Sequence, residues 1–376
     1  HIESIPSLFE YRFGKPAKCV LAAMVAFAMV GTVAAQVTAT ATIIKLLGGQ
    51  VGISYEMGAF IATAIFIIYT AASGLFGVVY TDVVQFFMLI IFVYLMIPFS
   101  SLDYLGGFGS FWASLDKSYI TPAIDGKILG DIVTYLVFTM AGAEMWQRAF
   151  AAKDKKSAKR GMFWGTAVYG VTIALLFLMG LAAQQILPNV VEEFGTADAV
   201  IPALAIKILP PGLTGLALSG ILSVMMSTAD SYLLSSATNL TNDIYVKYIR
   251  KDATDKQKML VLRGTIIVFS FIAVALTLYF PTVLSLQMTA YTMYGAAITP
   301  AILFALFSKK VTPAGGMAGI LVGGLVTIIW TLMGTPYGIQ CAIVAVPASV
   351  IAILIVSAVT RCNDPKRSLE ALYQDN

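Results

Sequence analysis

The chain has 376 residues, of which 59% are hydrophobic and 12% are charged, and its mean hydropathy is +0.85. Such values lie far from those of soluble domains and indicate a protein that crosses a membrane many times. The net charge is only +4, and the only histidine is His1, which excludes histidine-based catalysis, histidine metal sites and histidine proton relays. The basic residues lie in loops and give no argument for a nucleic-acid partner. The three cysteines, Cys19, Cys341 and Cys362, have neither metal-binding nor redox spacing.

Ten apolar runs are long enough to cross a hydrocarbon layer of about 30 Å, which takes about 20 residues of helix. They cover approximately residues 18–46, 54–75, 78–99, 128–150, 160–185, 212–246, 259–280, 283–307, 313–334 and 339–360. The link between the second and third runs, Gly74 to Val78, is so short that it predicts a tight hairpin. The predicted fold is all-α, with about ten transmembrane helices. We expect one transmembrane domain over residues 1–376, with a loop at 1–17, a helix bundle at 18–360 and a tail at 361–376.

Basic residues are concentrated in alternate connections between these runs. They follow the fourth, sixth, eighth and tenth runs: Arg148, Lys153, Lys155, Lys156, Lys159 and Arg160; Lys247, Arg250, Lys251, Lys256, Lys258 and Arg263; Lys309 and Lys310; Arg361, Lys366 and Arg367. The opposite connections, residues 100–127 and 186–211, are mainly acidic. Because short cytoplasmic loops are rich in Lys and Arg, the pattern predicts an integral protein of the plasma membrane with both ends of this chain in the cytoplasm.

The fourth run, DIVTYLVFTMAGAEMWQRAF, contains three small residues, Ala141 to Ala143, followed by Glu144. This sequence predicts a local unwinding of the helix, which frees backbone groups to bind ions and substrates. The alternative is a close helix contact at Gly142, which is common in membrane bundles. The segment alone does not decide between them.

The sixth run contains SGILSVMMSTADSYLLSSATNLTND, residues Ser219 to Asp243. Every fourth residue from Ser219 to Ser235 is serine, so these hydroxyls share one helix face. Asp230 lies next to this line, with apolar residues on both sides and no basic residue nearby. A hard cation such as Na⁺, or a proton, is the simplest partner for this group. The alternative for the hydroxyls is bonding back to carbonyls of their own helix.

Two further features of the apolar runs are ambiguous. Asp82, in VVYTDVVQFF, is either a functional carboxylate of the membrane interior or a solvated helix end. In the eighth run, Gln287, Tyr291 and Tyr294 form a weaker polar stripe. This stripe either contributes to a polar substrate pocket or packs against other helices.

Four segments together resemble the sodium:solute symporter family. IPSLFEYRFG (Ile5–Gly14) is similar to the cytoplasmic loop before the family's third core helix, and GLFGVVYTDVVQ (Gly74–Gln85) to the start of its fifth. EMWQRAFAAKDKKSAKRG (Glu144–Gly161) resembles the end of the sixth core helix and the following loop, and SVMMSTADSYLLSSATNLTNDIY (Ser223–Tyr245) the eighth. The resemblance is nearest to the choline-transporting branch and its bacterial neighbours.

The resemblance implies a five-plus-five inverted-repeat core, Na⁺ as coupling ion, and symport of a small polar organic solute by alternating access. It implies the lipid bilayer and the solute as partners, with no enzymatic activity, nucleic acid or obligate protein partner. The family's broken first core helix lies upstream of the segment that Ile5–Gly14 resembles. We therefore expect this chain to be an incomplete core, truncated at its N-terminus, that does not transport alone.

The resemblance also assigns ion ligands by position. The main sodium site corresponds to Ser227, Thr228 and the carbonyl of Val224. A second cation site, present in some members, corresponds to Asp82, Asp230 and Ser231. Sodium-coupled sugar relatives tend to carry a hydroxyl where this chain has Asp230, so the added charge favours stronger Na⁺ binding or a proton.

By position, the family's substrate contacts and gate on the sixth core helix correspond to Tyr135 and Phe138. Gly142 stands near an expected tryptophan, so no aromatic cage for choline is evident, which argues against choline as substrate. We add Gly142, Gln287 and Tyr291 to the predicted substrate site.

Three other functions compete with Na⁺-coupled symport. A proton-coupled permease of the same fold is the closest. A transporter-like membrane sensor is second, but the tail ends at Asn376 without a kinase-like segment. A membrane enzyme is third, because no nucleophile with its base, metal cluster or phosphate loop is visible.

Overall fold

The computed structural model describes residues 5–121, 125–142, 152–280 and 282–360. For residues 5–7, 72–79 and 243 it describes the backbone alone. The described residues are almost entirely helical and contain no strand. In chain order, the helices of the first half are α1 (Ile5–Phe13), α2 (Lys15–Gly48), the 3₁₀ turn η1 (Gly49–Val51), α3 (Tyr55–Met88), the π-helix η2 (Leu89–Leu95), α4 (Met96–Tyr104), α5 (Phe108–Ser114), the 3₁₀ turn η3 (Lys117–Ile120) and α6 (Gly126–Ala141).

The second half continues the same pattern. Its helices are α8 (Lys155–Ile186), α9 (Val190–Phe194), the 3₁₀ turn η4 (Ala197–Ala199), α10 (Val200–Ile208), α11 (Pro211–Asn239), the π-helix η5 (Leu240–Ile249), α12 (Asp255–Tyr279), α13 (Val283–Phe307), α14 (Pro313–Leu332), the 3₁₀ turn η6 (Pro336–Gly338) and α15 (Cys341–Val359). Among the described residues, eight helical stretches are long and apolar enough to cross a membrane. The shorter apolar stretch Tyr55–Ala71 and α6 correspond to the other two of the ten predicted runs.

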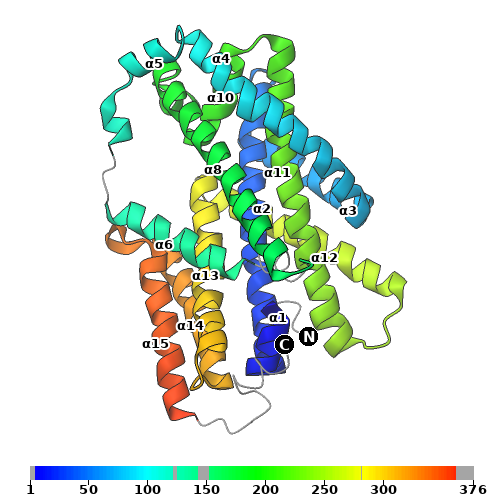
Figure 1. The fold of residues 1–376 in the computed structure, drawn as a ribbon. Coiled ribbons are helices and arrows are strands. Elements are labelled where there is room, and N and C mark those ends of the chain that lie inside the picture. The colour runs from blue at the N-terminus through cyan, green and yellow to red at the C-terminus, as the bar shows by residue number, and fades with distance from the viewer. Residues whose placement is uncertain (1–4, 122–124, 143–151, 281, 361–376) are drawn as a thin grey trace.

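Helix α2 forms the centre of the bundle. Figure 1 shows it running the length of the molecule, with α1 at its lower end. Most of its residues are buried, and it packs against α3, α11, α12 and α13. Because α2 touches most of the other long helices, most of its side chains meet protein, whereas Phe27 remains 46% exposed.

Helix α3 folds back on itself. A straight helix would separate residues 69 and 81 by about 18 Å, at 1.5 Å per residue. Nevertheless, the hydroxyls of Tyr69 and Thr81 are hydrogen-bonded to each other. The two halves of α3 therefore lie side by side, in agreement with the tight hairpin predicted for this link. This reversal brings residues on both sides of the link to the same face of α11.

The two ends of the bundle differ in what they contain. At the end that carries α1, Arg12 donates from Nε to the carbonyl of Ala305 and from Nη2 to that of Ser308, both at 2.9 Å, and so satisfies carbonyls at the end of α13. At the opposite end, one cavity is lined by residues from the α2–α3 connection, the α9–η4 segment and the end of α12. Within the segment expected as a loop at residues 1–17, residues 5–13 and 15–17 are helical instead. The tail at 361–376 lies outside the described residues.

Helices α14 and α15 pack closely through glycines. A Cβ at Gly319 would come within 2.3 Å of a side-chain carbon of Ile353 on α15. A Cβ at Gly323 would come within 2.5 Å of the carbonyl oxygen of Ala296 on α13. Small residues let membrane helices approach at this distance. The pair therefore packs against the middle of α13, C-terminal to the predicted substrate residues of that helix.

Candidate ion and substrate sites

The serines of α11 divide into two groups. Ser223 donates to the carbonyl of Ser219 at 2.7 Å, and Ser236 donates to that of Tyr232 at 2.6 Å. These hydroxyls are satisfied within their own helix, as the alternative interpretation predicts. The segment between them behaves differently, because Ser227 and Asp230 make their hydrogen bonds to α3.

Asp230 is completely buried, with 0% of its surface exposed. Its Oδ1 accepts a hydrogen bond from the hydroxyl of Thr70 on α3, whereas Oδ2 is buried without a partner among the described residues. Moving an isolated charge from water into a protein interior costs several kcal/mol in real proteins, and roughly tens of kcal/mol in an ideal low-dielectric medium. A partner of opposite charge or a proton offsets this cost. A cation or a proton at Oδ2 would provide that compensation.

Asp82 supplies a second carboxylate at the same place. Its Oδ1 accepts a hydrogen bond of 2.6 Å from the hydroxyl of Ser227, and its charge acts on Asp230. Two carboxylates and two hydroxyls thus gather between α3 and α11, and the ion pairs among the described residues include neither acid. Such an all-oxygen, net-negative set suits a hard cation or a proton.

The fold brings some of the predicted ion ligands together and leaves others apart. Asp82, Asp230 and Ser227 come together, so Ser227 links the two predicted ion sites. Val224 and Thr228 are half-buried on the same helix, one turn before and one residue after Ser227. Ser231 is exposed and forms no hydrogen bond with either carboxylate among the described residues. Its assignment as a cation ligand stays a prediction.

Thr70 is a site residue that sequence reasoning missed. It is buried, and its hydroxyl fixes one oxygen of Asp230. A single threonine in an apolar run carries no signal of its own. The short link from Gly74 to Val78 does indicate its role. A hairpin at this link places residues before it, such as Thr70, beside residues after it, such as Asp82.

The predicted substrate residues meet where α6 packs against α13. The rings of Phe138 and Tyr291 are stacked, with centroids 3.6 Å apart and planes at 17°, and Tyr135 contacts Tyr291 edge to face at 5.6 Å. Thr134 and Thr292 hydrogen-bond across the same contact at 3.3 Å. The three aromatic residues therefore form one cluster with a half-exposed face, since 45% of Tyr135 is exposed.

The remaining two predicted substrate residues lie about one turn from this cluster along the chain. Gln287 is one turn before Tyr291 and donates weakly to the hydroxyl of Thr32 on α2, at 3.5 Å. Gly142 is buried and no longer helical, because α6 ends at Ala141. The end of the helix agrees with the predicted unwinding, whereas Glu144 lies outside the described residues.

Known proteins with similar sequences identify the family. The sequence profile of the sodium:solute symporter family matches residues 3–323. The chain belongs to the sodium:solute symporter family. The osmoregulated proline transporter OpuE of Bacillus subtilis is 30% identical over 88% of this chain and 68% of its own length. The sodium/proline symporter of Escherichia coli is 29% identical over 77% of this chain and 60% of its own length. The sodium/pantothenate symporter of Haemophilus influenzae is 26% identical over 77% of this chain and 61% of its own length.

The fold agrees with that family. A solved structure of a Na⁺-coupled sialic acid symporter in a substrate-bound, outward-open state superimposes with a TM-score of 0.73, covering 95% of this chain and 77% of that one, at 20% identity. As a sodium:solute symporter, the protein is an integral membrane transporter rather than an enzyme. Its activity is Na⁺-coupled symport of a small solute.

Proposed function

We propose that the carboxylates and hydroxyls between α3 and α11 bind the coupling ions. Ser227, Thr228 and the carbonyl of Val224 contribute to a main Na⁺ site, and Asp82 and Asp230 to a second cation site. The observation that carries this proposal is the completely buried Asp230, whose Oδ2 has no partner among the described residues and whose neighbour is another acid. Thr70 joins the second site as the hydroxyl that orients Asp230.

The proposed solute is a small zwitterion of the proline type. Two of the relatives named above are proline transporters, and the third carries pantothenate, another small carboxylate. The proposed binding surface is the aromatic cluster of Tyr135, Phe138 and Tyr291, with Gln287 and Gly142 about one turn away along the chain. Aromatic faces bind the apolar part of such a solute, and also attract a cationic nitrogen.

The proposed orientation puts α1 and the C-terminal end of α13 on the cytoplasmic side of the membrane. The cavity between the α2–α3 connection, α9–η4 and the end of α12 then opens to the outside. Transport proceeds by alternating access, with ion binding at α11 stabilising the outward-open state. Ion and solute then raise each other's affinity by the same factor.

The test is uptake of radiolabelled L-proline by the full-length transporter in proteoliposomes. We expect uptake to require a Na⁺ gradient, and Ser227→Ala combined with Thr228→Ala to abolish it. Ser223→Ala is the matched control, since Ser223 bonds only to its own helix. Undiminished uptake by the double variant at low Na⁺ refutes the ion site, and uptake of pantothenate without proline refutes the solute.

A second candidate for the ion at Asp230, a proton carried in addition to Na⁺, is favoured by one specific observation. Asp230 and Asp82 are acids close enough for their charges to interact, and a shared proton relieves that repulsion as a cation does. Uptake driven by Na⁺ across a pH series, with Na⁺ replaced by Li⁺ or choline as the control, separates the two. Na⁺-driven uptake that a pH gradient increases supports a proton at Asp230, whereas uptake that does not respond to a pH gradient supports a second Na⁺.

A further inference from the structure

One cavity outside the sites above lies at the end of the bundle where α2 and α3 join. It has a volume of about 880 Å³, which is within the range of small-molecule sites, about 300–1,000 Å³. The wall formed by α2 and α3 contributes Thr38, Thr42, Lys45, Ser54 and Tyr55. The facing wall contributes Glu193, Thr196 and Asp198, and α12 adds Thr277.

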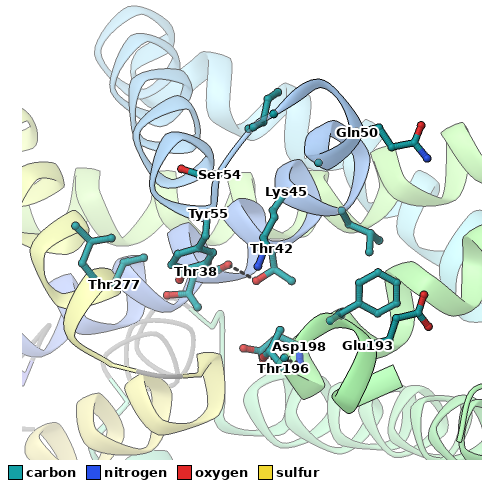
Figure 2. A pocket seen from close by; sticks show the side chains of 18 of the residues that line it. Thr38, Thr42, Lys45, Gln50, Ser54, Tyr55, Glu193, Thr196, Asp198 and Thr277 are labelled. Carbon is teal, nitrogen blue, oxygen red and sulfur yellow. Dashed lines mark hydrogen bonds between the residues drawn. The ribbon is translucent and has the colours of Figure 1, made fainter. Parts of the chain in front are cut away.

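Among the described residues that line this cavity, Lys45 is the only basic one. It is exposed and makes no ion pair with any described residue. Figure 2 shows it at the centre of the cavity, close to Thr42, with Asp198 on the wall below and Glu193 to one side. An ammonium group beside threonine and tyrosine hydroxyls is a suitable partner for a carboxylate.

The hydroxyls of this wall differ in their availability. Thr42 donates to the carbonyl of Thr38, and Thr38 to that of Ala34, both at 3.0 Å. Thr42 therefore keeps its lone pairs for a further donor, whereas the hydroxyl of Thr38 also interacts with that of Tyr55. Thr277 also donates to the carbonyl of Ala34 at 3.0 Å. The wall therefore offers acceptors as well as the cation of Lys45.

The facing wall carries the opposite charge. Asp198 accepts from the backbone N–H of Val283 through Oδ2 at 2.9 Å, which fixes it at the start of α13. Glu193 is exposed and has no ion pair among the described residues. One cation faces two anions across the cavity. A simple carboxylate meets repulsion here, a simple cation meets Lys45, and a zwitterion satisfies both walls.

We propose that this cavity is a second, outer binding site for small zwitterions, in which Lys45 pairs with the carboxylate and Glu193 and Asp198 face the ammonium. The identification of this ligand with the transported solute rests on the proposed function. The site captures the solute at the mouth of the bundle before it reaches the aromatic cluster of α6 and α13. A competing explanation is that Lys45, in the last turn of α2, only stabilises the helix end through its dipole.

The experiment places a single thiol on the cavity wall of the full-length transporter, in a cysteine-free background. Ser54→Cys serves for this, because Ser54 lines the cavity and is exposed. The rate of labelling by a sulfonate-bearing thiol reagent is compared with that of a trimethylammonium-bearing one. We expect Lys45→Gln to lower the sulfonate-to-ammonium rate ratio about fivefold, the equivalent of an exposed ion pair of about 1 kcal/mol.

Protection from labelling identifies the ligand class. In the protein that retains Lys45, we expect L-proline to slow labelling. Propionate and choline each carry only one of the two charges and should slow it much less. Lys45→Gln removes the protection and Lys45→Arg retains it, which a role confined to folding does not predict. Lys127→Gln is the matched control, since Lys127 lines a separate cavity of about 240 Å³ beside Asp131. Protection that persists in Lys45→Gln, or equal protection by propionate or choline, overturns the proposal.

Uptake of L-proline, measured on the same protein, keeps the two proposals apart. Protection without Na⁺-driven uptake supports the outer site and refutes proline as the transported solute. Uptake without protection supports the proposed function and refutes the outer site.

Discussion

The contact between α11 and α3 and the contact between α13 and α6 are both close helix packings, but they are built from different chemistry. The first encloses two acids, Asp82 and Asp230, with hydroxyls and no basic residue in an ion pair among the described residues. The second contains stacked aromatic rings and a glycine, Gly295. The two contacts therefore suit different ligands. The acids between α3 and α11 suit a cation, and the aromatic face between α6 and α13 suits an organic solute.

Helix α2 touches both contacts, which suggests how they communicate. It packs against α11 and α13, and its Thr32 accepts from Gln287 one turn before the aromatic cluster. A cation that neutralises Asp230 removes a cost of keeping α3 and α11 together. The packing of α3 against α11 and the packing of α13 against α6 can both require the same position of α2. In that case the ion and the solute stabilise the same state of the protein.

The largest effect is expected from Asp230→Asn, which breaks the charged contact and leaves the aromatic one intact. The amide keeps the size of the side chain and loses its charge, so about 1.5–3 kcal/mol of charge-assisted bonding to a cation disappears. The Na⁺ concentration for half-maximal uptake should rise about 10- to 150-fold. Uptake at varied Na⁺ measures this. If Na⁺ dependence is unchanged and only pH dependence is lost, Asp230 carries a proton.

Gly295→Val attacks the other contact through packing. A Cβ at residue 295 would lie 2.6 Å from a side-chain carbon of Val137 and 2.9 Å from the backbone nitrogen of Phe138, so α6 has to move. Overpacking of this kind costs about 1–3 kcal/mol. A lower thermal unfolding midpoint, together with weaker solute binding, is the expected result. Gly212→Val is the control, since nothing lies within 4 Å of the Cβ position there.

Tyr291→Leu tests the aromatic face without changing the backbone. It removes a ring that stacks on Phe138 and touches Tyr135. An aromatic pair contributes about 0.5–1.5 kcal/mol beyond area burial, so we expect the KM for solute to rise by up to about tenfold. The Na⁺ dependence should stay near that of the unmodified protein. A shift in Na⁺ affinity as large as that of Asp230→Asn would show that the two contacts are not separate.

The sequence was sufficient to predict the helices but only part of the site. Apolar runs and loop charges predict ten spans, because length and hydropathy act locally. The serine spacing on α11 also predicts one polar face. It does not tell Ser223, which bonds within its own helix, from Ser227, which bonds to Asp82 on α3. That distinction depends on which helix lies opposite, and so does the role of Thr70.

The smallest effect is expected at the end of the bundle that carries α1, away from both contacts. The hydrogen bond from Lys18, at 2.7 Å, lowers the pKa of Glu10, with its own partial burial acting in the opposite direction. A carboxyl with a lowered pKa adds stability above its unfolded pKa, and this stability is lost as the pH falls through the folded pKa. Because Glu10 is about one third exposed, Glu10→Gln should cost only about 0.2–1 kcal/mol near neutral pH. Thermal unfolding of both proteins across an acid pH series measures this, and the difference should vanish once Glu10 is protonated. A difference that persists at low pH would assign it to packing of α1 under α13 instead of the ion pair.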